Sequence, residues 1–79
     1  MTNINIHRVT NLTGLNAQAR VPPTTDQSYI VVQFNIVSHS HNGEEEMGVS
    51  LFLKSIDDGG QMADAFSALA HQIRVEAAK

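Results

Sequence analysis

Two runs of alternating apolar and polar residues flank the dipeptide Asn42-Gly43 in the middle of the chain. Asn-Gly tolerates the positive φ angles of a type I′ turn, so the pattern predicts a β-hairpin between Ser28 and Ser55 with these two residues as its loop. In this register three pairs are apolar on both strands: Ile36 with Val49, Phe34 with Leu51, and Val32 with Leu53. A shift of one residue would place apolar residues opposite polar ones, because side chains alternate between the two faces of a strand.

The predicted hairpin has one apolar face that needs a cover. Its β-branched and aromatic side chains suit a half-buried sheet surface, and they are Ile30, Val32, Phe34, Ile36, Met47, Val49, Leu51 and Leu53. The segment Gln61–Ala77 predicts an amphipathic helix, because its large apolar residues recur every three or four positions. Asp58 is the expected N-cap, with Gln61 in the capping-box position. We expect this helix to cover the apolar face.

The N-terminal third predicts two further short strands. Apolar and polar residues alternate around residues 4–6 and again over residues 15–21, and turn-forming residues 11–14 are expected to link the two strands. Residues 22–26, Pro-Pro-Thr-Thr-Asp, indicate an exposed loop. The expected fold is a single α+β domain over residues 1–79, a four-stranded antiparallel β-β-β-β meander with one C-terminal α-helix packed on one face.

The composition narrows the classes of function. The chain has 79 residues, no cysteine, and a net charge of -3 with five scattered lysines and arginines. Scattered cations argue against a nucleic-acid partner, and the absence of cysteine excludes thiol catalysis and fits a reducing compartment. The first eight residues lack the apolar run of a signal peptide or membrane anchor, so we expect a soluble, cytoplasmic protein with no membrane partner. A chain this small has a modest core, so association with itself or a partner is expected to support the fold.

No catalytic or cofactor-binding motif is present in the sequence. Gly59-Gly60 is an isolated pair without the spaced glycines and the lysine of a phosphate-binding loop. The serines and histidines do not have the spacing of a nucleophile elbow or a catalytic triad. We therefore expect a non-enzymatic protein without a cofactor.

A polar cluster surrounds the predicted turn. In the predicted register His39 faces Glu46 and His41 faces Glu44, so two imidazoles and two carboxylates share one face. Such a set suits a divalent metal such as zinc, but an exposed hairpin end lacks the surrounding hydrogen bonds that hold metal ligands in place. Two cross-strand His–Glu pairs are the simpler expectation, and a metal site is the alternative.

The other face of the hairpin carries an apolar and aromatic patch formed by Tyr29, Val31, Val37 and Phe52. Aromatic residues clustered inside a polar rim are typical of the centre of a protein interface. We therefore expect a protein-binding module, alone or as a homodimer, that uses this patch. The polar rim is expected to comprise Glu44, Glu45 and Glu46.

In size, net charge, lack of cysteine and strand-then-helix pattern, the chain resembles small accessory proteins encoded by phages and mobile elements. Some proteins of that kind inhibit host defence proteins. The resemblance matches no diagnostic residue and transfers no site. It implies an alternative function, an anti-CRISPR-like inhibitor that occupies a basic surface of a defence complex through Glu44, Glu45, Glu46, Asp57 and Asp58.

Overall fold

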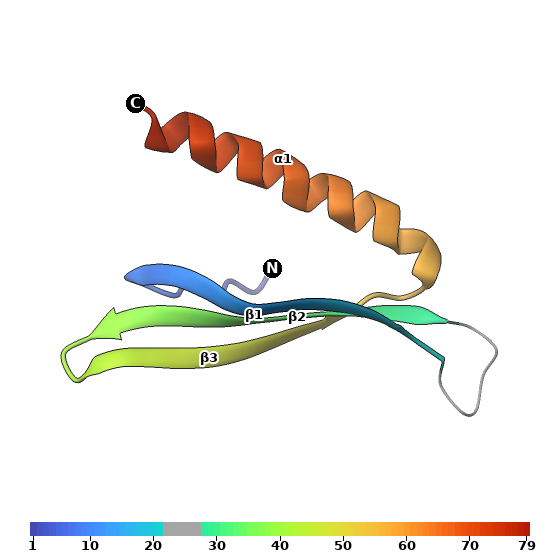
Figure 1. Ribbon diagram of the computed structural model, residues 1–79, viewed down its shortest axis with the longest axis horizontal. Coiled ribbons are helices and arrows are strands. Elements are labelled where there is room, and N and C mark those ends of the chain that lie inside the picture. The colour runs from blue at the N-terminus through green and yellow to red at the C-terminus, as the bar shows by residue number, and fades with distance from the viewer. Residues whose placement is uncertain (22–27) are drawn as a thin grey trace. The chain divides into compact units, whose positions relative to one another are not determined.

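A computed structural model describes residues 1–21 and 28–79 of the chain (Figure 1). Its elements are β1 (Val9–Arg20), β2 (Tyr29–Ser40), β3 (Gly43–Phe52), the 3₁₀ helix η1 (Ile56–Asp58) and α1 (Gly59–Ala77). The strands form an antiparallel sheet in the order β1-β2-β3. The sheet and the C-terminal helix confirm the α+β class. The predicted loop at residues 22–26 lies outside the described residues.

The chain divides into two units by its internal contacts, and each unit is described by itself. The first comprises Met1–Gln18 and Val31–Phe52, and the second comprises Ala19–Ile30 and Leu53–Lys79. The packing of the helix on one face of the sheet therefore stays a prediction, as does the single domain.

The predicted fourth strand is absent from the residues that the structure describes. Residues 1–7 have no regular secondary structure, and the Ile4 side chain is exposed. A single strand, β1, instead runs through residues 11–14, which were predicted to form a turn. Gly14 has a φ of +61°, which glycine adopts at little cost, so the chain kinks at this residue without reversing. An outer strand tolerates such an irregularity because only one of its edges is paired.

The hairpin is confirmed, but its predicted register is wrong by two residues. Ser40 pairs with Gly43, so His41 and Asn42 form the loop. The prediction failed because a type I′ turn needs positive φ at both loop residues. Asn42 does not have a positive φ, since Arg8 is the one non-glycine residue of the described chain that does. Gly43, with φ +106°, takes a positive φ directly after the loop instead of within it.

The Ser40 side chain organises this turn. Its Oγ accepts a hydrogen bond from the Asn42 N–H at 3.3 Å, an arrangement typical of serine at turns. The hydroxyl proton of Ser40 has two acceptors within reach, the Gly43 carbonyl oxygen at 3.0 Å and Glu45 Oε1 at 3.2 Å. These contacts favour the observed closing pair over the predicted one.

A two-residue shift keeps every side chain on its predicted face, because side chains alternate with a period of two. The apolar face therefore still pairs apolar with apolar residues: Val32 with Leu51, Phe34 with Val49, and Ile36 with Met47. The pattern determined the faces, and the turn determined the register.

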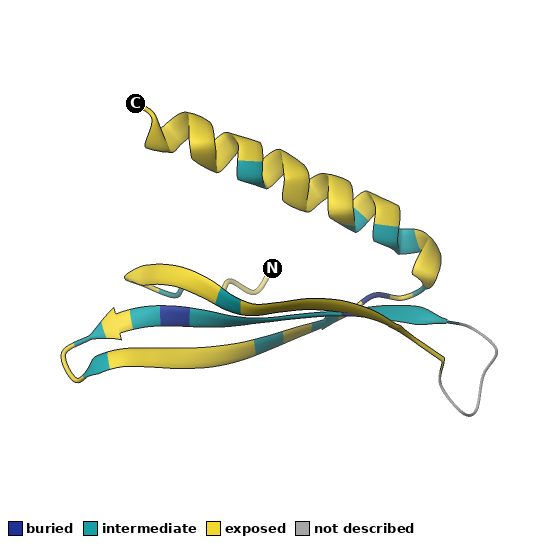
Figure 2. Ribbon diagram, in the orientation of Figure 1, coloured by how far each residue is buried: buried dark blue, intermediate teal, exposed yellow. Residues whose placement is uncertain are grey.

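Burial follows strand position more closely than it follows the predicted faces (Figure 2). Leu53 is buried, as predicted, but Val31 and Val37, which were expected to face solvent, are also buried. Both valines lie on β2, the central strand of the sheet. On the predicted buried face, β2 residues are half-buried and Met47 of β3 is exposed.

Helix α1 begins two residues earlier than predicted and ends at Ala77, as predicted. Asp58 occupies the N-cap position, but its side chain makes no capping hydrogen bond; Asp58 Oδ2 instead accepts a hydrogen bond from Ser55 Oγ at 3.2 Å. Gly59 allows the helix start to approach the beginning of β2, because a Cβ there would lie 2.7 Å from Ile30 Cδ1. None of the described helices combines the length and apolar character needed to cross a bilayer.

Candidate protein-binding surface

The four residues of the predicted patch differ in exposure, although Val31 lies directly opposite Phe52. Phe52 keeps 68% of its surface exposed, whereas Val31 and Val37 are 1% and 7% exposed. Tyr29 is half-buried at the start of β2, in the second unit. Phe52 is therefore the patch residue with a broad exposed surface, and the two valines serve the interior.

The predicted His/Glu cluster does not form. The register places His39 opposite Glu44 and Val37 opposite Glu46, and His41 lies in the loop. No group of three histidine, aspartate or glutamate residues comes close enough to hold a metal ion within residues 1–21 and 28–79. The structure therefore gives no support to the alternative of a metal site at the turn.

Strand alternation instead groups five β3 residues on one face, which we call the β3 face: Glu44, Glu46, Gly48, Ser50 and Phe52. Two carboxylates lie at the turn end and one aromatic ring at the other end, with the small residues Gly48 and Ser50 between them. Glu46 and Phe52 are six residues apart, about 20 Å along an extended strand. Glu45 points to the opposite face.

Two glycines that the sequence analysis did not single out make room for a β2 side chain beside this face. The Asn35 side chain on β2 lies between Gly14 and Gly48. A Cβ at Gly14 would lie 2.9 Å from Asn35 Nδ2, and one at Gly48 would lie 3.5 Å from Asn35 Oδ1. Glycine inside a strand often marks such a close approach, and that signal was available in the sequence.

The acidic end of the β3 face has no cation of its own within the described part of the chain. The ion pair that the described residues form lies at the end of α1, where Lys79 Nζ is 2.9 Å from Glu76 Oε2. Glu44 and Glu46 are exposed, and Glu45 accepts a hydrogen bond from the Ser40 hydroxyl. The carboxylates of Glu44 and Glu46 are therefore accessible to positive groups on another molecule.

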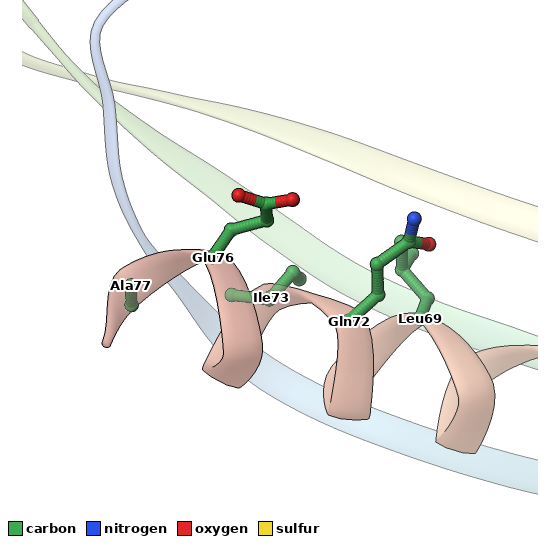
Figure 3. Close-up of a pocket in the computed structure, with 5 residues that line it drawn as sticks. All are labelled: Leu69, Gln72, Ile73, Glu76 and Ala77. Atoms are coloured by element: carbon green, nitrogen blue, oxygen red, sulfur yellow. The ribbon is translucent and has the colours of Figure 1, made fainter. Parts of the chain in front are cut away.

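A shallow hollow follows the last turns of α1 (Figure 3). Its lining residues are Leu69, Gln72, Ile73, Glu76 and Ala77. All five come from a single helix, so the hollow lacks the enclosure by several elements that is typical of small-molecule sites. It offers no arrangement of a nucleophile, a base and an orienting group.

Comparisons with protein families, with curated proteins and with solved structures find no match to this chain. A proposal for the function of the chain therefore has to come from side-chain exposure and charge on the β3 face.

Proposed function

We propose that the chain is a non-enzymatic protein-binding module and that the β3 face is its contact surface. The exposed Phe52 ring carries the proposal, since a phenylalanine that is 68% exposed leaves most of a large apolar side chain in water. An aromatic anchor bordered by polar residues is the composition of an interface centre and its rim.

Charge indicates the chemistry of the partner. The chain carries a net charge of -3, and Glu44 and Glu46 are exposed on the same face as Phe52. A complementary partner has an apolar pocket for the ring and basic residues about 20 Å away for the carboxylates. Such rim charges accelerate association and lose their effect as salt rises.

The exposed glutamates also support the inhibitor alternative, in which the acidic turn occupies a basic surface of a host defence protein. The two proposals differ in their anchor. Binding by a module anchored at Phe52 persists at high salt, whereas binding by an inhibitor held by Glu44, Glu45 and Glu46 is lost. Affinity measured at 50 mM and 500 mM salt separates them.

The test begins with capture of partners on the immobilised full chain, followed by affinity measurements on the partner identified. Phe52→Asp is expected to raise the Kd at least about 30-fold, because truncating an interface hot spot costs about 2 kcal/mol or more. Val75→Asp is the matched control, since it also places a carboxylate at an exposed apolar position, but on α1. Equal Kd values for the Phe52→Asp variant and the wild type would refute the proposal.

A further inference from the structure

Strand β3 forms one edge of the sheet. The strand order is β1-β2-β3, so β3 pairs with β2 along one side and has no neighbouring strand on the other among the described residues. An edge of this kind presents backbone N–H and C=O groups in the geometry that another strand needs.

The hydrogen bonds show which residues present those groups. The His39 N–H donates to the Arg8 carbonyl oxygen at 3.0 Å, so odd-numbered β2 residues bond toward β1 and even-numbered ones bond toward β3. The register pairs the even-numbered β2 residues with odd-numbered β3 residues. Because hydrogen-bonded pairs alternate in an antiparallel ladder, odd-numbered β3 residues bond toward β2. Even-numbered residues direct their backbone groups outward, among them Glu44, Glu46, Gly48 and Ser50.

The two outer strands differ in how well their edges can pair. β1 has Gly14 at φ +61° within it and Arg8 at φ +59° just before it, and both conformations interrupt a regular edge. β3 pairs with β2 without a break from Gly43 to Phe52. The glutamates protect only its first half, whereas Met47–Phe52 carries no charge.

The β3 sequence is self-complementary when two copies run antiparallel about Val49. Met47 then lies opposite Leu51 of the second copy, which continues the apolar face of the sheet across the junction. Gly48 lies opposite Ser50, and both residues direct backbone groups outward, so they form a hydrogen-bonded pair. The even-numbered residues that direct backbone groups outward and the odd-numbered apolar residues therefore both favour this alignment.

Charge favours this alignment as well. The two acidic triplets lie at opposite ends of the junction, whereas parallel pairing would place them side by side. Residues 47–51 of both copies, which carry no charge, then form the centre of the junction.

We propose that β3 pairs with β3 of a second copy of this chain and forms a six-stranded sheet centred on Val49. This junction uses backbone groups at the edge and leaves the Phe52 side chain on the face of the sheet. Both proposals use β3, the homodimer through its backbone edge and protein binding through the Phe52 side chain. Their tests measure different quantities, the dimer dissociation constant and the Kd of the partner, so the failure of one is distinguishable from the failure of the other.

Sedimentation equilibrium of the full chain from about 1 to 500 µM tests the proposal. Ser50→Pro removes an outward N–H that β2 does not use, and is expected to raise the dimer dissociation constant at least about tenfold. Ser50→Ala, which keeps the N–H, is the matched control and is expected to dimerise as the wild type does. A wild-type monomer at 500 µM, or a dimer that Ser50→Pro leaves unchanged relative to Ser50→Ala, would overturn the proposal.

A cysteine at the centre of the junction keeps the test decisive if the proline variant does not fold. In the proposed alignment Val49 lies opposite Val49 of the second copy, and the chain has no cysteine of its own. Val49→Cys is therefore expected to form a disulfide-linked dimer under mild oxidation, because opposite residues of antiparallel strands have Cα atoms about 4.5–5.5 Å apart. Glu45→Cys is the matched control, since the two Glu45 positions would lie about 26 Å apart along the junction. Absence of a linked Val49→Cys dimer, or equal linking of both variants, would overturn the proposal.

Discussion

Replacing Val31 by alanine tests whether the structure has correctly separated the interior from the contact surface. Val31 is 1% exposed and Phe52, its cross-strand partner, is 68% exposed, although the sequence placed both in one exposed patch. If the burial is right, the smaller side chain matters more for stability, and the larger one matters more for binding.

The magnitude follows from the area removed from water. Valine to alanine deletes two buried methyl groups, worth about 1.6 kcal/mol by transfer, and the remaining cavity raises the loss to about 2–3 kcal/mol. A 79-residue domain has a free energy of unfolding of about 4–12 kcal/mol, so the loss is a large fraction of the total. Phe52→Ala removes a side chain that is already mostly in water and is expected to cost less than about 1 kcal/mol.

Thermal and urea unfolding followed by circular dichroism, at one protein concentration, measure both variants. Val31→Ala is expected to lower Tm by about 10–20 °C, whereas Phe52→Ala lowers it by a few degrees. The fixed concentration matters because self-association also stabilises the fold. A loss of stability in Phe52→Ala that equals or exceeds that in Val31→Ala would refute the assignment of Val31 to the interior.

Four substitutions test three glycine positions and the turn. Gly14→Ala is expected to lower the free energy of unfolding, measured in urea, by about 1–2 kcal/mol, because the left-handed φ disfavours a Cβ and the new Cβ would lie 2.9 Å from the Asn35 amide. The Cβ of Gly48→Ala would make an ordinary 3.5 Å contact with the same side chain. This control substitution is expected to be neutral or to stabilise the fold by about 0.5 kcal/mol. Gly60→Ala meets no atom within 4 Å in the first turn of α1. It is expected to raise the free energy of unfolding by about 0.5–1 kcal/mol through helix propensity, and a lower Tm would contradict the helix start. Ser40→Ala removes the acceptor of the turn N–H and is expected to cost about 0.5–1.5 kcal/mol; an unchanged urea midpoint would show that the turn does not need this side chain.

The sequence by itself determined the hairpin, the two faces of its strands and the C-terminal helix. These features depend on local periodicity, in which a period of two separates the faces of a strand and a spacing of three or four marks one side of a helix. Phe34 and Val49 share a face in the structure as they do in the prediction. A register error of two residues leaves that grouping intact.

Only the tertiary structure decided the features that depend on neighbours in space. The turn depends on which residue takes the positive φ, and Asn42-Gly43 allows that conformation either at both residues within the loop or at Gly43 alone after it. The N-terminal strand passes through residues that usually form turns because, in an outer strand, Gly14 can kink the chain while one edge stays paired. The burial of Val31 depends on the residues around it in space, and the strand order that places β2 in the centre is a property of the whole sheet that no local pattern contains.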